Sequence, residues 1–174
     1  IVSSVEESVR LARELVAEGY RRLQVKVGMA PELDAERLAA VREAVGGDVV
    51  LYADANGSFT TGAARRFLRA TRGLEYALEQ PCRTYAECAA LRPQCDRPLV
   101  LDESIVTLED LLRAHHDRVA DGITVKLQRV GGITRACLLR DVASELGIEV
   151  AVEAAGGASL VTAAVVHAGL GTAE

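Results

Sequence analysis

The stretch VVLYADANG, residues 49–57, joins an uninterrupted apolar run to an acid and then to a turn. A strand that is apolar at nearly every position is buried on both faces, which is typical of a parallel strand covered by helices. Asp54 ends the run, and Asn56 and Gly57 lie in the turn that follows. The stretch therefore predicts an α/β fold in which a charged side chain stands at the carboxyl end of a buried strand.

Similar apolar runs recur about every 25 residues, which leaves room for one strand, one loop and one helix in each repeat. We predict strands over 23–27, 49–53, 76–79, 99–102, 123–126 and 149–152. We predict helices over 4–18, 34–45, 60–72, 84–92, 107–116, 132–146 and 157–168. Each connection is long enough to hold a helix, so neighbouring strands are expected to pair in parallel. Three helix starts have or approximate the spacing of a capping box, namely Ser4 with Glu7, Thr84 with Glu87 and Thr107 with Asp110.

Two architectures bury parallel strands on both faces, a β/α barrel and a doubly wound sheet. A dinucleotide-binding sheet would carry GxGxxG after its first strand, whereas the turn here reads KVGMAPELD over residues 26–34. Charged residues at the ends of successive strands are instead typical of a barrel mouth. A closed barrel needs about eight strands and roughly 250 residues. We therefore expect residues 1–174 to be one catalytic barrel domain with six of the strands, a part of a larger enzyme whose first and last strands lie outside this chain.

The composition argues against several classes of protein. The net charge is −5 and the basic residues form no stripe, so a nucleic-acid surface is not expected. The chain has neither the apolar run of a membrane span nor a secretory signal, so no membrane partner is expected and the predicted compartment is the cytoplasm. The four cysteines form no CxxC pair and are expected to be reduced core or surface residues.

Five charged side chains stand at the ends of predicted strands, namely Lys26, Asp54, Glu79, Asp102 and Lys126. The carboxyl ends of barrel strands converge, so these side chains are expected to point into one shared mouth. Three acids gathered there would repel one another unless a cation lay among them. The set therefore predicts a divalent-metal site formed by the three acids and flanked by two amines.

These strand ends resemble motifs of the enolase superfamily, in its mandelate racemase and muconate lactonising enzyme branch. LQVKVG (23–28) resembles the KxK strand of that branch. The segments YADANG, LEQPC and LDES resemble its three metal-ligand strands, and ITVKLQRVGGIT (123–134) resembles the strand that carries the opposite lysine. The five motifs occur in the order found in the family, and the resemblance spans nearly the whole chain.

The resemblance implies a TIM-type (β/α)7β barrel that removes the proton next to a substrate carboxylate through an enediolate. Asp54, Glu79 and Asp102 would bind Mg²⁺, with Mn²⁺ as an alternative metal. Lys26 and Lys126 would stand on opposite faces of the substrate carbon, and burial beside a cation is expected to lower the pKa of such a lysine. The resemblance further implies a homo-oligomer and an N-terminal α+β capping domain, outside this chain, that closes over the barrel.

Several neighbouring residues are candidates for supporting roles. Asn56, Gln80 and Glu103 lie one or two positions from predicted metal ligands, and we expect them either to orient those ligands or to be exposed loop residues. Gln24 replaces the first lysine of the KxK pattern, so an amide that can still donate a hydrogen bond replaces a positive charge. Glu153 would either bind a substrate amine or be a solvated acid at a strand end.

The QxK form, together with LEQPC and KLQRVGG, resembles members that act on proline betaine, hydroxyproline betaine or cis-3-hydroxyproline. Those relatives have a tryptophan and an aspartate around a Gly-Gly pair, where this chain has Ala155 and Ala158. The missing aromatic ring argues against a quaternary ammonium substrate. The leading hypothesis is a racemase, epimerase or dehydratase of a small amino-acid-derived carboxylate. The alternatives are a Schiff-base lyase that uses Lys126 and a noncatalytic remnant or regulatory subunit.

Overall fold

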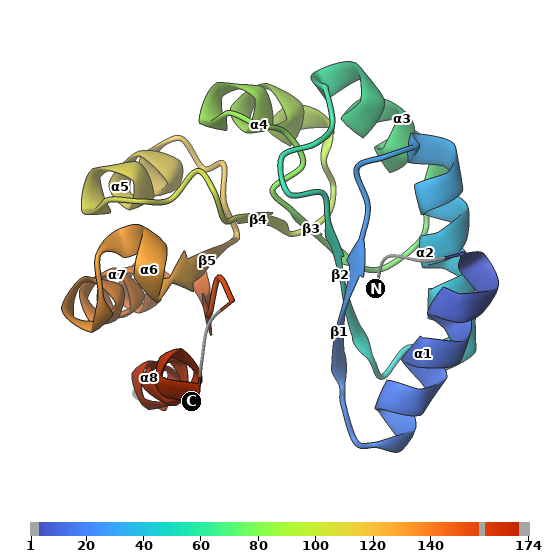
Figure 1. Ribbon diagram of the computed structural model, residues 1–174. Coiled ribbons are helices and arrows are strands. Elements are labelled where there is room, and N and C mark those ends of the chain that lie inside the picture. Colours follow the sequence, from blue (N-terminus) through green and yellow to red (C-terminus); the bar gives the residue numbers. More distant parts are fainter. Residues whose placement is uncertain (1–3, 157–158, 171–174) are drawn as a thin grey trace. The chain divides into compact units, whose positions relative to one another are not determined.

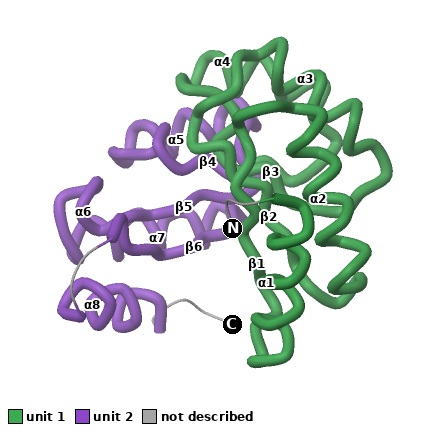
Figure 2. The backbone as a smooth tube through the Cα atoms, turned by 45° about the vertical axis from the view of Figure 1, so that its right-hand side comes forward, with its two compact units in different colours: residues 1–99 green, residues 100–174 purple. Residues whose placement is uncertain are grey.

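The structure, a computed structural model, describes residues 4–156 and 159–170 (Figure 1). The chain divides into two compact units, residues 1–99 and residues 100–174, which Figure 2 colours separately. In both units parallel strands alternate with helices. The predicted α/β class is therefore confirmed, while the prediction that the whole chain forms one barrel domain stays a prediction.

The first unit contains the strands β1 (Arg22–Lys26), β2 (Val50–Asp54) and β3 (Ala77–Glu79), which are neighbours in that order. Its helices are α1 (Val5–Ala17), α2 (Pro31–Val45), α3 (Thr61–Ala70), α4 (Tyr85–Leu91) and the short 3-10 helix η1 (Arg92–Gln94). Helices α1 and α2 lie on the same side of β1 and β2 (Figure 1). The buried core of this unit includes Val25, Leu38, Leu51, Phe67 and Leu78.

The boundary between the units falls within β4 (Leu99–Leu101). The second unit continues with β5 (Gly122–Lys126) and β6 (Glu149–Glu153), in the order β4-β5-β6. Its helices are α5 (Leu108–His116), α6 (Leu127–Val130), α7 (Ile133–Glu145) and α8 (Ser159–Gly169). Its buried core includes Leu101, Ile105, Leu111, Ile123 and Leu139.

All six predicted strands are present, with ends that differ by one residue or less. The predicted helices are also present, whereas the two short elements η1 and α6 were not predicted. The start of the helix predicted over 157–168 lies outside the described residues, as does Ala158. Strand β6 contains no fully buried residue, so it is the most exposed strand of the second unit.

Side-chain caps explain where several helices begin. Thr84 Oγ1 accepts the N–H of Glu87 (3.3 Å), and the Glu87 carboxylate accepts the N–H of Thr84 (3.0 Å). Thr107 and Asp110 form the same reciprocal pair at the start of α5. At α1, Ser4 Oγ accepts the N–H of Glu7 (3.2 Å). These bonds satisfy N–H groups that the first turn of a helix leaves without a backbone partner.

Helix α2 begins at Pro31 rather than at the predicted residue 34. Proline suits this position because the first turn does not need its missing N–H. Asp34 is only 1% exposed and accepts the backbone N–H groups of Gly28, Met29 and Ala30 at 2.9, 3.0 and 3.0 Å. The Asp34 carboxylate therefore holds together the loop between β1 and α2.

The same carboxylate also ties α2 to the end of β1. Arg37 donates hydrogen bonds to Asp34 Oδ1 (2.6 Å) and to the backbone carbonyl of Lys26 (2.6 Å). Gly28 has a φ of +110°, and a Cβ atom there would lie 2.9 Å from the carbonyl oxygen of Ala55. Only glycine fits such a conformation and such a close approach. The segments that follow β1 and β2 are thus held against each other.

The part of the chain that the structure describes contains no helix long and apolar enough to cross a membrane. All four cysteines are free, as predicted. Cys82, Cys88 and Cys95 are buried, and Cys137 is partly exposed. Burial raises the pKa of Cys95, which favours its neutral thiol.

Asp34 provides a test of this account of the fold. Asp34→Ala removes the acceptor of three backbone N–H groups and the charge that faces Arg37. We expect the free energy of unfolding to fall by about 3 kcal/mol, because buried charged hydrogen bonds contribute more than neutral ones. Glu32→Ala removes only an exposed ion pair with Arg66 (3.1 Å) and should cost less than about 1 kcal/mol. Urea denaturation measures both losses, and equal losses would contradict the role of Asp34.

Candidate functional site

Three charged strand ends of the first unit stand in one row of the sheet. Lys26 is the register partner of Asp54, and Asp54 is the register partner of Glu79. The two acids are 1% and 2% exposed. Buried carboxylates are costly unless hydrogen bonds or positive charges compensate them. The row therefore brings together a lysine and two acids that need partners.

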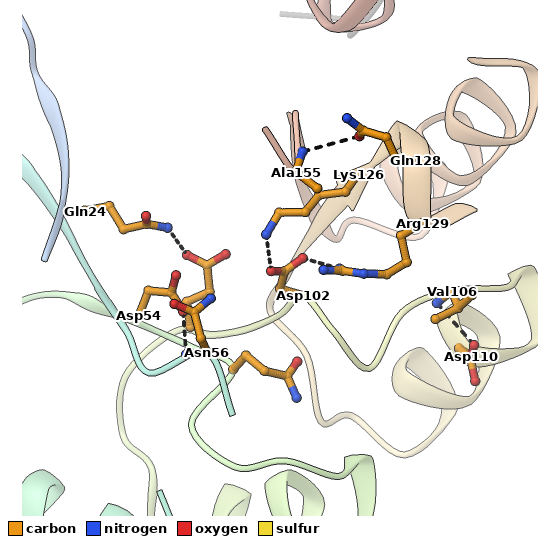
Figure 3. A network of polar contacts seen from close by, with 12 residues as sticks. Gln24, Asp54, Asn56, Asp102, Val106, Asp110, Lys126, Gln128, Arg129 and Ala155 are labelled. Atoms are coloured by element: carbon orange, nitrogen blue, oxygen red, sulfur yellow. Dashed lines mark hydrogen bonds and ion pairs between the residues drawn. The ribbon is translucent and has the colours of Figure 1, made fainter. Parts of the chain in front are cut away.

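The chain supplies part of that compensation. Lys26 Nζ forms an ion pair with Asp54 Oδ2 and donates to Asn56 Oδ1 at 2.9 Å. Gln24 Nε2 donates to Glu79 Oε2 at 2.8 Å; Gln24, Asp54 and Asn56 are drawn in Figure 3. Gln24 is neutral, so it gives Glu79 a hydrogen bond and no charge. Carboxylate oxygens are the ligands that Mg²⁺ prefers, so the chemistry of Asp54 and Glu79 fits a divalent cation.

The turns after β2 and β3 have unusual backbone conformations. Asn56 and Gln80 have φ values of +44° and +32°. These values lie in the left-handed region, which residues other than glycine rarely adopt. The N–H of Asn56 donates to Asp54 Oδ1 at 2.8 Å. Gln80 is fully buried and its Nε2 donates to the carbonyl of Cys82 at 2.9 Å. Asn56 thus holds both Asp54 and Lys26 although it is exposed, whereas Gln80 braces the loop after β3.

In the second unit two cations hold one acid. Asp102 follows β4 and is 0% exposed. Lys126 Nζ binds its Oδ2 atom at 2.5 Å, and Arg129 Nη1 binds its Oδ1 atom (Figure 3). Arg129 was not among the predicted site residues. It lies on α6, the short helix that begins directly after Lys126, and the turn from strand to helix in KLQR was the feature that could have indicated it.

Burial and the charge of Asp102 shift the pKa of Lys126 in opposite directions. Burial lowers its pKa, but the hydrogen bond and the charge of Asp102 outweigh burial, so the pKa lies above its ordinary value. Arg129 lowers the pKa and Glu153, the register partner of Lys126, raises it. The carboxylate to which the lysine is paired therefore outweighs burial, and the lower pKa expected beside a bound cation stays a prediction.

The remaining predicted residues of the second unit are less enclosed. Glu103 follows Asp102 and is partly buried, and Glu153 ends β6 in a partly exposed position. Gln128 on α6 donates to the carbonyl of Gly156 (2.8 Å) and accepts the N–H of Ala155 (3.3 Å). Gln128 therefore fixes the segment after β6, in which Ala155 stands.

Over residues 4–156 and 159–170, no three Asp, Glu, His or Cys side chains form a metal cluster as they stand. The carboxylates in question instead contact groups of the chain itself. Asp54 pairs with Lys26, Glu79 with Gln24, and Asp102 with two cations. A bound metal would therefore compete with these contacts for carboxylate oxygens.

Comparison with known proteins identifies the family to which the sequence is similar. The sequence matches the family described as "Enolase C-terminal domain-like" over residues 7–174. It is 38% identical over 151 residues to cis-3-hydroxy-L-proline dehydratase of Roseibium aggregatum, a match that covers 87% of this chain and 41% of the relative. It is 34% identical over 154 residues to L-Ala-D/L-Glu epimerase of Clostridium acetobutylicum, covering 85% of this chain and 43% of that protein.

A solved structure matches as well. A member of the enolase superfamily from Roseovarius nubinhibens, complexed with magnesium, has a TM-score of 0.93 and 30% identity, and the match covers 99% of this chain and 47% of that one. The predicted fold class, part of a TIM-type barrel, is confirmed by this likeness. The chain spans less than half the length of these three proteins. The chain belongs to the enolase superfamily, in its mandelate racemase and muconate lactonizing enzyme branch.

Proposed function

We propose that the protein removes the proton α to a substrate carboxylate with the help of Mg²⁺, through an enediolate, and then racemises, epimerises or dehydrates the substrate. The observation that carries this proposal is the row Lys26, Asp54 and Glu79, in which a lysine stands beside two buried acids. The similarity to a dehydratase and to an epimerase supports the reaction class.

The choice of basic residue supports a role in proton transfer. Lys26 and Lys126 are the only lysines in the chain, and every other residue of the Lys and Arg total of 20 is an arginine. Arginine stays protonated at any pH that proteins tolerate, whereas lysine can lose its proton when its surroundings change. A chain that uses arginine for all its other cations therefore has lysine only at the two strand ends where a base is proposed.

Asp54, Glu79 and Asp102 are the residues we propose to hold the metal. Asp54 and Glu79 end strands of the first unit, and Asp102 follows β4 in the second unit. All three are buried. Mg²⁺, when bound, would supply positive charge that stabilises the negative charge of the deprotonated substrate. Arg129 would keep Asp102 ionised and oriented, because its guanidinium remains paired with Oδ1.

Lys126 must be neutral to accept a proton, and the carboxylate of Asp102 opposes that state. Any cation that takes an oxygen of Asp102 weakens the hydrogen bond that favours the ammonium form. Lys26 likewise forms an ion pair with Asp54 in the first unit. Each proposed base is therefore paired with a proposed metal ligand. Metal binding to the acid and proton transfer by the lysine are linked through this pairing.

The proposed substrate is a small amino-acid-derived carboxylate of the proline type. The similarity to cis-3-hydroxy-L-proline dehydratase supports this class. Glu153, in register with Lys126, would bind the substrate amine. The segment after β6 offers Ala155 and no aromatic ring, so we propose a secondary amine rather than a quaternary ammonium group.

The lysine proposal is tested by substitutions that keep the charge. Lys126→Arg and Lys26→Arg retain a cation beside the acid but cannot release a proton at neutral pH. We expect α-proton exchange in D₂O, followed by NMR on the full-length protein with proline derivatives and other amino-acid carboxylates, to fall about a hundredfold or more. Arg66→Lys, an exposed change on α3, serves as the control and should leave exchange unchanged. Undiminished exchange in both arginine variants would contradict the proposed bases.

The metal proposal is tested on binding and on exchange. Asp54→Asn and Glu79→Gln keep the side-chain size but remove the charge, and each should weaken Mg²⁺ binding about tenfold or more. Glu32→Gln is the control for loss of an exposed acid. Calorimetric titration with Mg²⁺ measures the binding, and chelation should stop exchange until Mg²⁺ is returned.

Two outcomes would favour other functions. Exchange or turnover that persists without metal, together with borohydride trapping of substrate on Lys126, would favour a Schiff-base lyase. A folded full-length protein that binds no Mg²⁺ and exchanges no proton across a broad substrate panel would favour a noncatalytic subunit.

A further inference from the structure

A second site, rich in arginine, occurs in the first unit. A cavity of about 320 Å³ is lined by Arg65, Arg69, Arg72, Gln94, Asp96 and Arg97. Helix α3 provides Arg65 and Arg69, the turn after it provides Arg72, and η1 with the segment before β4 provides the other residues. The cavity therefore lies between the last turns of α3 and the η1 segment.

This cavity stands at the end of the unit opposite to the acids. Helix α3 follows β2 and leads back to the start of β3 at Ala77, so Arg69 and Arg72 lie near the amino ends of the strands. Arg97 precedes the start of β4. Asp54 and Glu79 stand at the carboxyl ends of β2 and β3. The arginine cavity is therefore separate from the proposed catalytic row.

The cavity has an excess of positive charge. Four guanidinium groups line it, and the one carboxylate, Asp96, is paired with Arg97. Within the described residues, Arg65, Arg69 and Arg72 have no acid as a partner. By contrast Arg66, on the same helix, pairs with Glu32 at 3.1 Å. A chain with a net charge of −5 thus gathers three surplus positive charges around one cavity.

The position of Arg97 is fixed by its neighbours. Its side chain is only 7% exposed, its Nη2 donates to the carbonyl of Thr71, and its guanidinium lies 4.9 Å from the ring centroid of Tyr76. Burial raises the pKa of Tyr76 to about 12, so the phenol stays neutral and does not balance the arginine. In the described structure the buried Nε atoms of Arg97 and Arg65 have no hydrogen-bond acceptor. The guanidinium of Arg97 is therefore held in one position at the wall of the cavity.

The chemistry of the wall indicates the class of ligand. Guanidinium groups bind phosphate oxygens through two parallel hydrogen bonds, and several of them together favour a dianion over a single carboxylate. The volume suits a small ligand. We propose that this cavity binds the phosphate group of a small phosphorylated molecule, or inorganic phosphate, at a site distinct from the proposed catalytic residues.

Calorimetric titration of the full-length protein with inorganic phosphate and with glycerol phosphate tests this proposal. Both ligands are expected to bind one site per chain. Arg69→Gln and Arg72→Gln remove exposed charges that have no partner to lose, and each should weaken phosphate binding about tenfold. Arg66→Gln on the same helix is the matched control and should leave the affinity unchanged. Thermal melting of each variant checks that the fold is retained.

Three results would overturn the assignment. The first is the absence of saturable phosphate binding, and the second is an equal loss of affinity in Arg66→Gln, which would indicate attraction to the surface as a whole. The third is tighter binding of citrate than of either phosphate ligand, which would assign the cavity to polycarboxylates. Exchange of the α-proton in Arg69→Gln is expected to match the wild type, so the result is independent of the proposed catalytic function.

Discussion

The burial of carboxylates at the ends of parallel strands is the constraint on which the rest of this structure depends. Asp54, Glu79 and Asp102 are almost fully removed from water, and each needs a positive charge or a hydrogen-bond donor there. The partners come from other strands or from α6, namely Lys26 and Gln24 on β1, Lys126 on β5 and Arg129 on α6. Other hydrogen bonds hold those partners in place; for example, Arg37 binds both Asp34 and the backbone carbonyl of Lys26. The side chains that stabilise the buried acids are therefore the same ones that form the candidate site.

The two units meet the requirement differently. In the first unit a single ammonium group faces two acids, and the amide of Gln24 supplies a hydrogen bond without a charge. In the second unit a lysine and an arginine share one acid, and Glu153 adds a further negative charge near the lysine. The first unit thus uses one cation and one neutral amide where the second uses two cations. The carboxylate oxygens of Asp54 and Glu79 suit the proposed Mg²⁺ even though Gln24 departs from the family pattern.

Much of this was readable in the sequence, because apolar runs of fixed spacing and acids at their ends are local features. The strands, most helix starts, the fold class and the charged strand ends followed from such patterns. The start of α2 did not, since Asp34 looks like an ordinary helix residue until its carboxylate is seen to accept three loop N–H groups. Arg129 was missed because its partner Asp102 is distant in sequence. The direction of the Lys126 pKa shift also depends on its contact with Asp102, which the sequence alone does not reveal.

The register of the first unit has a consequence for how such a protein can evolve. Side chains alternate between the two faces of a strand, so a one-residue insertion or deletion in β2 would turn Asp54 away from the row that it shares with Lys26 and Glu79. The register of these three side chains thus restricts the length of β2, even where the stability of the fold would tolerate a change. Loops at the opposite, amino-terminal ends carry no such restriction. A change of loop length there, on the side where the arginine cavity lies, leaves the register of Lys26, Asp54 and Glu79 intact.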